Sequence, residues 1–509
     1  MSRYLGIDLG TSAVKALVLE DGGRVLAKGR APYPLIHPQV GWSEQDPGDW
    51  WQAVGSASRQ ALAGAGSGAL SGVALSGQLN GLVLLDERLE PLENALIWLD
   101  QRAVQEAAYL NATFPELLRR AAINPANPIY VGAKLLWLRR HRPDLLERAR
   151  HLILAKDFIN LRLTGELATD TSDASCTLLY DLRRDDWLRE LLDAAAFPPE
   201  RLPPLHRSTD VIGRVTAAAE QVTGVPLHTP VMAGAGDVTA LSVGSGAIDE
   251  DVVSVTLGTA GHVVVASRDL TPDGYERIWQ MRHAVADRYI RLGLVMSGGL
   301  SLSWFERELG DEERRLANTS GRDVYELLLG RVAASEPGAR GVLYLPFLEG
   351  AATPFQEPDL RGAFLNVASS HGKADLLQAV LEGVAYNIRD CVALFEALGS
   401  DIREVRLSEG GSRSDAWCQV IADVLEKPVL TLHEIDASAL GAAMIAMAGA
   451  SGGADALGAV IGTVVRTQAD RRFEPRTALA PLYDRLYRRY RQAAGHLLDW
   501  VHDSRPGAA

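Results

Sequence analysis

The stretch GIDLGTSAVKALVLE (residues 6–20) returns in altered form as VTLGTAGHVVV (residues 255–265). In each copy an apolar segment leads into Leu-Gly-Thr and a small residue, and a second apolar segment follows. This pattern is typical of two antiparallel strands joined by a tight glycine turn. Glycine lets a ligand approach the backbone closely, and successive N–H groups with hydroxyls can surround phosphate oxygens. Both turns are therefore predicted to bind phosphate.

The chain around these turns alternates strands and helices in a way that suggests two halves. An acidic segment, GSGAIDEDVV (residues 244–253), directly precedes the second copy of the turn. A chain of 509 residues also exceeds what one hydrophobic core usually holds. We therefore predict an internally duplicated α/β architecture, with domains at residues 1–246 and 247–509 and a cleft between them.

The composition is that of an ordinary acidic protein. The net charge of −13 and the pI of about 5.4 argue against nucleic acid or an anionic membrane as a partner. The three cysteines, Cys176, Cys391 and Cys418, are far apart, which favours buried thiols in a reducing compartment. We find no leader pattern and no apolar run of membrane-spanning length, and we expect a cytoplasmic protein.

The first turn carries the residues that distinguish it from the second. Asp8 ends the first strand, and Thr11, Ser12 and Lys15 follow it. A carboxylate at this position suits a hard cation such as Mg²⁺, held directly or through water. The second copy has a threonine in place of the aspartate, so Gly258 and Thr259 are predicted to bind phosphate without a metal ligand.

A third segment, GAGDVTA (residues 234–240), places Asp237 between a glycine turn and the start of a helix. The helix dipole favours an ionised carboxylate there, and such a group can accept a proton from a substrate hydroxyl during phosphoryl transfer. On this stretch alone, a helix-capping aspartate without a chemical role is an equally good interpretation.

Two glycine pairs complete the set of candidate ligand contacts. Gly410 and Gly411 separate a strand from a helix, so an adenosine could lie flat on their bare backbone, with Gly298 and Gly299 as the opposite wall. Each pair alone is also typical of a tight turn without a ligand.

Other nucleotide and hydrolase motifs lack their structural context. The chain has no GxxxxGK[ST] segment, and no GxGxxG lies between a strand and a helix. One GxSxG match, at residues 449–453, contains Ser451 but follows a helix-like run, whereas a nucleophile elbow follows a strand. A serine hydrolase is therefore disfavoured, and Gly449 is interpreted as the residue that ends the helix.

Taken together and in order, these segments resemble the FGGY family of carbohydrate kinases over nearly the whole chain. The second signature of the family is followed except at Asn366, where glycine is usual. The segments that carry the resemblance are GIDLGTSAVK (6–15), GWSEQDPGDWW (41–51), LSGQLNG (75–81), ALIWLDQR (95–102), AKLLWLRRH (133–141), GAGDVTA (234–240), TLGTAG (256–261), RGAFLNVASSHGKADLLQAVLEGVAYN (361–387) and EGGSRSDAW (409–417).

The resemblance implies two domains of the actin-like ATPase (ribonuclease H-like) type, each a mixed sheet flanked by helices. Sugar would bind in the N-terminal domain and ATP mainly on the C-terminal one. Asp237 would be the general base, Asp8 would help to hold Mg²⁺, and Thr11 and Thr259 would approach the β- and γ-phosphates. The resemblance further implies nucleotide contacts at Gly299, Gly410, Gly411 and Asp415, and sugar contacts at Gln78, Leu79, Asn80, Trp98 and Asp100.

Within the family, the likeness is greatest to members that phosphorylate the ketopentose D-xylulose. Those members usually have histidine where this chain has Asn80, and many have asparagine where it has Val238. Polar pocket groups dominate discrimination among hydroxylated substrates, so another ketose, a polyol or an aldonate (ribulose, L-xylulose, erythritol, glycerol or gluconate) stays open. An actin-like or chaperone-like ATPase without a sugar substrate is the alternative from another class. Homodimers are common among such kinases, and a homodimer is possible here.

Overall fold

The structure is a computed structural model that describes residues 2–504 and forms two compact units. Unit 1 holds the residues up to Ile248 together with Ala266–Ile290 and Asp436–Val465. Unit 2 holds Asp249–Val265, Arg291–Ile435 and the residues from Arg466 onward. The chain therefore passes between the units several times. The predicted single division at residues 246 and 247 includes none of the later crossings.

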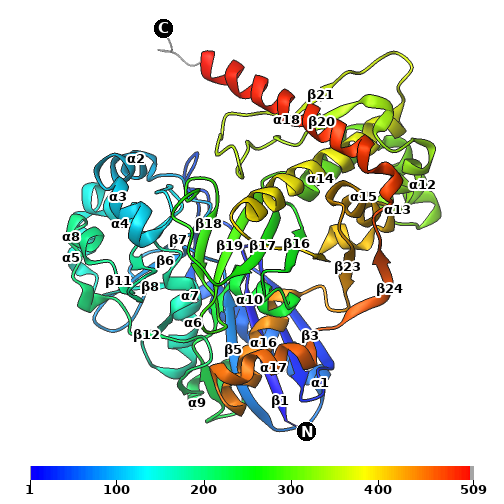
Figure 1. Cartoon of the computed structure of the whole chain (residues 1–509). Helices are drawn as coiled ribbons and strands as arrows, with labels where there is room; N and C mark the ends of the chain where they lie inside the picture. The colour runs from blue at the N-terminus through cyan, green and yellow to red at the C-terminus, as the bar shows by residue number, and fades with distance from the viewer. Residues whose placement is uncertain (1, 505–509) are drawn as a thin grey trace. The chain divides into compact units, whose positions relative to one another are not determined.

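Unit 1 is built on a mixed sheet whose centre is the predicted glycine hairpin (Figure 1). Strands β1 (Arg3–Leu9), β2 (Ala13–Glu20) and β3 (Val25–Pro32) form an antiparallel meander. On the other side of β1 lies the parallel strand β5 (Leu70–Gly77), and β14 (Pro230–Met232) continues the sheet parallel to β5. The sequence pattern predicted β1, β2 and the glycine turn between them.

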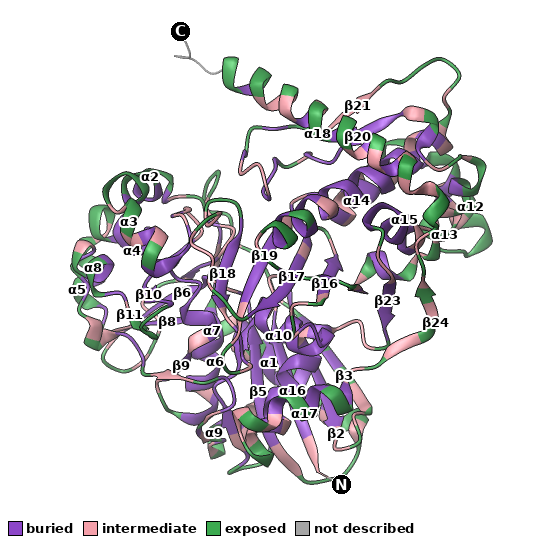
Figure 2. Cartoon of the chain, viewed as in Figure 1, coloured by how far each residue is buried: buried purple, intermediate pink, exposed green. Residues whose placement is uncertain are grey.

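Each face of this sheet is covered by a helix from a different part of the chain. Side chains alternate along β1, so that Leu5 and Ile7 join the core that contains α1 (Pro47–Ala65). Tyr4 joins the opposite core, which contains α16 (Ala437–Ser451). Gly6 faces α16 so closely that a Cβ atom would lie 2.2 Å from the Ala439 carbonyl oxygen. The strands are consequently buried along most of their length (Figure 2).

Helix α1 begins directly after an aspartate that caps it. The Asp46 side chain caps it by accepting a hydrogen bond from the Gly48 amide at 2.7 Å, and Pro47 occupies the first helical position. The remaining elements of unit 1 are β4 (Glu44–Gln45), β6 (Leu82–Leu85), β7 (Ala95–Leu96), α2 (Val104–Thr113), α3 (Pro115–Leu117), η1 (Leu118–Ala122), α4 (Val131–His141), α5 (Pro143–Arg148), β8 (His151–Leu154), α6 (Ala155–Thr164), β9 (Thr169–Asp170), α7 (Thr171–Ala174), β10 (Tyr180–Asp181), β11 (Asp186–Trp187), α8 (Arg189–Ala194), η2 (Pro199–Arg201), β12 (Leu205–His206), β13 (Val211–Arg214), α9 (Ala217–Thr223), β15 (Ala235–Gly236), α10 (Asp237–Ser245), β18 (Trp279–Arg282) and α17 (Ala454–Val464).

Unit 2 repeats the central topology of unit 1. Strands β16 (Val252–Leu257) and β17 (Gly261–Ser267) form the second glycine hairpin, and β22 (Glu404–Ser408) lies parallel to β16 as β5 lies parallel to β1. Strand β23 (Val429–Leu432) continues parallel to β22, and β24 (Thr467–Phe473) pairs antiparallel with β23. The predicted duplication is therefore present in the strand order.

Helices cover the strands of unit 2 as well, the longest being α14 (Lys373–Ala397). Asn366 precedes it in a left-handed conformation (φ 63°), which explains an asparagine where glycine is usual. The remaining elements are β19 (Tyr289–Val295), α11 (Gly298–Leu309), α12 (Asp311–Ser320), α13 (Val324–Gly330), η3 (Arg331–Ala334), η4 (Ala339–Gly341), β20 (Leu343–Leu345), β21 (Ala363–Leu365), η5 (Gly410–Arg413), α15 (Asp415–Leu425), η6 (Thr477–Leu479) and α18 (Ala480–Asp503).

The interpretation of Gly449 was wrong. Helix α16 runs through Gly449 to Ser451 and ends at Gly452, whose φ of 153° few other residues adopt. Gly449 instead permits close packing, because a Cβ atom there would lie 2.6 Å from the Thr209 carbonyl oxygen. Ser451 lies in a helix and donates a hydrogen bond to the Met447 carbonyl oxygen. The strand that a nucleophile elbow requires is absent before Ser451, as the sequence indicated.

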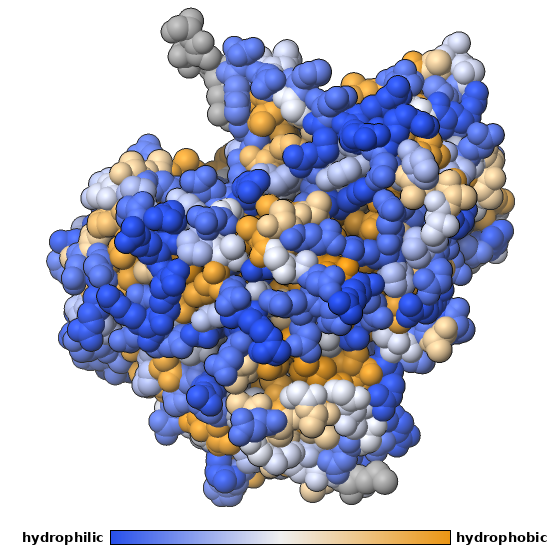
Figure 3. Space-filling view, in the orientation of Figure 1, coloured by the Kyte–Doolittle hydropathy of each residue, from blue (hydrophilic) through white to orange (hydrophobic). Residues whose placement is uncertain are grey.

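Hydrophilic side chains dominate the face of the molecule seen in Figure 3. Large hydrophobic side chains with high exposure, such as Val40, Val104 and Trp500, come from different elements. The three cysteines are free and buried, as predicted. Among residues 2–504, no helix is both long enough and apolar enough to cross a membrane.

Candidate active site

The carboxyl ends of three parallel strands meet at one edge of the sheet in unit 1. In this register Asp8 of β1 lies beside Ser76 of β5, and Gly236 of β15 lies beside Gly77 of β5. The first glycine turn, the Gln78–Asn80 segment and Asp237 follow directly on these strand ends. The edge thus brings together three groups of residues that the sequence singled out separately.

Asp8 is a buried carboxylate close to both charged and polar groups. It accepts a hydrogen bond from the Ser76 hydroxyl at 2.8 Å and lies opposite Lys15 in the hairpin register. Burial raises the pKa of Asp8 above its usual range, and the Asp436 charge adds to this, whereas Ser76 and Lys15 act in the opposite direction. A cation beside this carboxylate would offset the cost of its burial.

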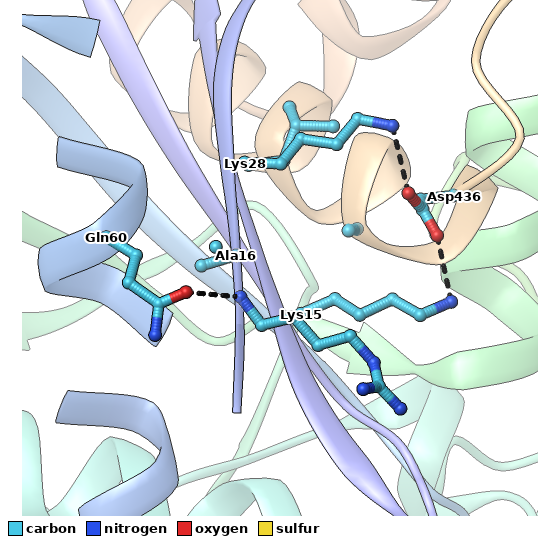
Figure 4. Close-up of a pocket in the computed structure, with 9 residues that line it drawn as sticks. Lys15, Ala16, Lys28, Gln60 and Asp436 are labelled. Atoms are coloured by element: carbon cyan, nitrogen blue, oxygen red, sulfur yellow. Dashed lines mark hydrogen bonds and ion pairs between the residues drawn. The ribbon is translucent and has the colours of Figure 1, made fainter. Parts of the chain in front are cut away.

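Lys15 lies beside a cavity of about 360 Å³ between β2, β3 and the start of α16 (Figure 4). Its ammonium group is 2.8 Å from one oxygen of Asp436, and Lys28 is 2.9 Å from the other. Burial acts to raise the pKa of Asp436, but the hydrogen bonds and charges of the two lysines outweigh it and lower the pKa. Sequence analysis missed Asp436, and the contact of Lys15 with phosphate stays a prediction.

A chain of hydrogen bonds fixes the first glycine turn. The Thr11 hydroxyl accepts a hydrogen bond from the Trp98 indole at 2.8 Å, and the Thr11 carbonyl accepts one from Gln45 at 2.6 Å. Gln45 in turn accepts a hydrogen bond from Gln78 at 2.8 Å. Thr11 is half-buried and Ser12 is exposed at the tip of the turn. The predicted phosphate turn and two predicted sugar contacts therefore form one connected group.

Leu79 and Asn80 lie next to the end of β15. Leu79 packs so closely on Gly236 that a Cβ atom at Gly236 would lie 2.3 Å from it. Asn80 adopts a left-handed conformation (φ 60°), and its side-chain oxygen accepts a hydrogen bond from the Val131 amide at 3.3 Å. These contacts place the predicted sugar segment beside Asp237.

Asp100 is fully buried and both of its oxygens already accept hydrogen bonds. One oxygen accepts from Arg102 and from the Ser43 amide, and Arg102 also contacts the other. The Arg102 guanidinium lies 3.7 Å from the centre of the Trp42 ring. A direct contact of Asp100 with sugar stays a prediction, whereas its support of the segment after Trp98 is visible in the structure.

Asp237 is the first residue of α10 and half-buried, while Gly236 occupies the cap position. The capping interpretation was therefore wrong by one residue. The Asp237 carboxylate accepts a hydrogen bond from the Val238 amide at 2.8 Å, and the helix N-terminus favours its ionised form. Val238 is buried. A carboxylate at the end of a strand, beside a helix N-terminus, can act as a proton acceptor if a substrate hydroxyl lies within reach.

A buried cluster of charges behind Asp237 was not found from the sequence. Lys156 contacts Asp157 at 2.6 Å, Asp170 at 2.9 Å and Asp173 at 3.7 Å. Burial raises the pKa of Asp173 well above its usual range, and the charges of Asp157, Asp170 and Asp237 add to it against Lys156. The acidic run TDTSD (residues 169–173) was the available signal, but no local pattern links it to Lys156 in the preceding helix.

In unit 2, the predicted nucleotide residues gather at the end of β16. The Gly299 amide donates a hydrogen bond to the Gly258 carbonyl oxygen at 2.7 Å, and Leu300 does the same to Thr259 at 3.0 Å. Gly298 and Gly299 begin α11, so the second glycine turn rests on the start of this helix. Thr259 is exposed.

The glycine pair after β22 lies against the same strand end. A Cβ atom at Gly411 would lie 2.5 Å from the Cβ atom of Leu257, and one at Gly258 would lie 2.4 Å from a carboxylate oxygen of Glu409. Gly410 and Gly411 form a short helical turn, and Asp415 begins α15, where it pairs with Arg471 at 2.7 Å. Glu409 was missed by sequence analysis, although it directly precedes the glycine pair.

Both parts of the chain match models of one protein family. Residues 3–244 match the N-terminal domain of the FGGY family of carbohydrate kinases, and residues 253–450 match its C-terminal domain. The chain belongs to the FGGY family of carbohydrate kinases. As a member of this family it is an ATP-dependent carbohydrate kinase, and its substrates are ATP and a sugar.

Individual relatives of this FGGY kinase align over nearly the full chain. The chain is 30% identical to the xylulose kinase of Bacillus subtilis (strain 168), with 98% of each chain covered. The crystal structure of xylulose kinase from Rhodospirillum rubrum has a TM-score of 0.88 at 31% identity and covers 98% of this chain and 100% of its own. The crystal structure of gluconate kinase from Lactobacillus acidophilus has a TM-score of 0.90 at 26% identity, with 98% of each chain covered.

These likenesses confirm the predicted fold of the FGGY kinase, with two domains that each hold a mixed sheet flanked by helices. They also confirm the predicted class of enzyme. The roles assigned to single residues, such as Asp8 and Asp237, stay predictions that rest on the geometry described above.

Proposed function

We propose that this kinase transfers the γ-phosphoryl group of ATP to a terminal hydroxyl of a small ketose, with D-xylulose as the favoured acceptor and D-xylulose 5-phosphate as the product. Relatives named xylulose kinase align with almost all of the chain, both in sequence and in structure. The observation that carries the chemical part of the proposal is the single sheet edge at which Asp8, Leu79–Asn80 and Asp237 meet.

In the proposed reaction, Asp237 accepts the proton of the attacking hydroxyl. Its place at the N-terminus of α10 favours the ionised carboxylate, and Leu79 and Asn80 are close enough to orient an acceptor beside it. Thr11 and Thr259 carry hydroxyls on glycine turns and would bind phosphate oxygens. Catalysis then consists of positioning and charge neutralisation, without a covalent enzyme intermediate.

The proposed metal ion is Mg²⁺, with Asp8 as its protein ligand. Residues 2–504 contain no group of three or more histidine, cysteine or acidic side chains that could hold a metal. Mg²⁺ commonly uses one or two carboxylates together with water and substrate phosphates, so one buried carboxylate fits this ion. When bound, the ion would neutralise charge on the phosphates. Asp8 would hold it, and Ser76 would orient Asp8 through their hydrogen bond.

A second acceptor class is supported by a specific observation. The gluconate kinase structure superposes as well as the xylulose kinase structures do, and Asn80 and Val238 depart from the usual D-xylulose pattern. An aldonate, another ketose or a polyol is therefore the second candidate. An ATPase without a sugar substrate is disfavoured because the Gln78–Asn80 segment lies at the same edge as Asp237.

The cellular compartment and the oligomeric state are also matters of proposal. Three free, buried cysteines agree with a reducing compartment, and we propose the cytoplasm. A homodimer remains a prediction that solution scattering or analytical ultracentrifugation would test.

The proposal is tested by ADP release from Mg-ATP with pentuloses, hexuloses, polyols and aldonates, with Asp237→Asn as the matched control. We expect D-xylulose to give the highest kcat/KM and Asp237→Asn to lose about 100-fold or more in kcat while it stays folded. Preference for gluconate or a polyol would replace the acceptor and keep the enzyme class. Turnover that needs no acceptor, or unchanged turnover by Asp237→Asn, would refute the proposed mechanism.

A further inference from the structure

Lys134 of α4 is a fully buried lysine whose contacts are all backbone carbonyl groups. Its ammonium nitrogen donates hydrogen bonds to the carbonyl oxygens of Ile97 at 2.6 Å, Asn80 at 2.8 Å and Leu96 at 3.4 Å. A lysine ammonium has three N–H groups, so these three acceptors use all of its donors. A lysine is rarely fully buried without such compensation.

The environment of Lys134 differs from that of the other fully buried lysine. Lys156 contacts three carboxylates, whereas the charged groups that act on Lys134 are Asp100 and Arg102, which pair with each other at 2.8 Å. These two charges act on the pKa of Lys134 in opposite directions. Burial lowers the pKa of Lys134 to about 7, with Asp100 raising it and Arg102 lowering it. The buried Lys134 ammonium group is therefore compensated by backbone carbonyl groups and not by a paired carboxylate.

The carbonyl groups that Lys134 holds belong to two segments that are separate in sequence. Asn80 is part of the segment beside Asp237 and adopts a left-handed conformation. Ile97 directly precedes Trp98, whose indole holds the Thr11 hydroxyl at 2.8 Å. The start of α4 makes a second contact with Asn80, because the Val131 amide donates a hydrogen bond to the Asn80 side chain.

We propose that Lys134 is a positioning residue of the acceptor site, which ties the Asn80 and Ile97 segments together and so sets the places of Asn80 and Trp98 against the sugar. The inference rests on the proposed binding of the sugar to these two segments. Lys134 itself lies behind them, since its side chain is buried and its donors are used by the backbone.

This role has a pH dependence with a definite sign. A neutral amine has two N–H groups in place of three and no positive charge, so it holds three carbonyl oxygens less well. As the pH rises through about 7, Lys134 loses its proton, because burial lowers its pKa to about 7. The acceptor KM is then expected to rise with pH, whereas the KM for ATP does not follow this titration.

Steady-state kinetics of Lys134→Met test the inference with whichever acceptor the wild-type enzyme uses best. We expect the acceptor KM to rise about tenfold or more and to lose its dependence on pH near 7, with the KM for ATP unchanged. Leu138→Ala is the matched control, because Leu138 is buried one turn further along α4. It should lower the melting temperature and leave both KM values as they are. An unchanged acceptor KM in Lys134→Met would overturn the inference.

Hydrogen exchange gives a readout that does not depend on enzyme activity. After correction for intrinsic rates, peptides that cover residues 78–82 and 95–99 should lose protection between about pH 6 and about pH 9, while peptides from β1 should not. Constant protection across this range would overturn the predicted pH dependence. If no sugar or polyol is phosphorylated at all, the proposed function fails, and the exchange of the same peptides in Lys134→Met and in the wild-type protein at about pH 7 still decides whether Lys134 ties these segments together. Equal protection in the two proteins would overturn the inference.

Discussion

The Gly236 amide donates a hydrogen bond to the Ser172 hydroxyl at 3.1 Å, so helix α7 supports the turn that carries Asp237. Ser172 in turn donates to Asp170 at 2.5 Å, and Asp170 contacts Lys156. The residue proposed as the base is therefore connected through one serine to a buried cluster of charges. Its position depends on that cluster as well as on its own helix.

Replacement of Ser172 by alanine should weaken catalysis more than binding. The change leaves the buried Gly236 amide without its acceptor and frees the turn before Asp237. We expect kcat to fall about tenfold with little change in the KM for ATP. Thr164→Ala is the control, since this buried hydroxyl bonds to the Asn160 carbonyl and the Glu166 amide and not to the Asp237 turn. Equal kinetics for the two variants would argue against a link between α7 and Asp237.

Replacement of Asp8 by asparagine should stabilise the protein while it lowers activity. A carboxyl whose pKa is raised by folding binds its proton more tightly in the folded state, so stability falls as the pH rises above about 4. Asparagine removes this cost and keeps an acceptor for Ser76. Melting curves should therefore show a higher melting temperature for Asp8→Asn at neutral pH, and a smaller difference toward about pH 4.

The Asp8→Asn variant should also need more Mg²⁺ for half-maximal turnover, since the proposed ligand has lost its charge. Asp401→Asn is a control for the stability measurement, because Asp401 is mostly exposed. A melting temperature for Asp8→Asn below that of the wild-type protein at neutral pH would contradict the prediction.

Replacement of Gly299 by alanine should affect the nucleotide and leave the sugar alone. A Cβ atom at Gly299 would lie 2.3 Å from the Gly258 carbonyl oxygen, which is backbone and cannot rotate away. The second glycine turn must then shift, and we expect the KM for ATP to rise about tenfold. Gly330→Ala is the matched control in α13, where a Cβ atom meets no atom within 4 Å. A rise in the acceptor KM alone would contradict this assignment.

Acid should destabilise unit 1 through His283. Its Nδ1 atom accepts a hydrogen bond from the Val285 amide, and burial lowers its pKa to about 3. In the unfolded protein His283 binds a proton below about pH 6.5, whereas in the folded protein it stays neutral until far lower pH. The free energy of unfolding therefore falls by about 1 kcal/mol per pH unit below about pH 6. His262 acts in the same direction, since burial lowers its pKa to about 4.

Urea unfolding at about pH 5 and about pH 7.5 measures this loss of stability. In His283→Asn the loss between the two conditions should be smaller, because His283 no longer titrates. His228→Asn should behave as the wild-type protein does, since His228 is exposed and in a left-handed conformation that asparagine tolerates. An identical loss in all three proteins would remove His283 from the explanation.

Local sequence patterns predicted the parts of the site that consist of a turn and its neighbours. Both glycine hairpins and the position of Asp237 at the start of a helix could be found in this way. The roles of Lys134 and Asp436 could not be predicted, because their partners are distant in sequence. A helical pattern does not show which distant group will hydrogen-bond or pair with a buried polar side chain. Gly449 was misread for a related reason, since its contact with Thr209 is visible only once the helix is packed.

The late return of the chain to unit 1 has a consequence for its synthesis. Lys28 and Asp436 are 408 positions apart, and α16 covers a whole face of the sheet that β1 and β2 begin. While the chain emerges from the ribosome, that sheet has no α16 to cover Tyr4, Leu17 and Leu19, and N-terminal domains usually fold first. The apolar face of the N-terminal strands therefore stays uncovered until α16 has been synthesised, more than 400 positions after these strands.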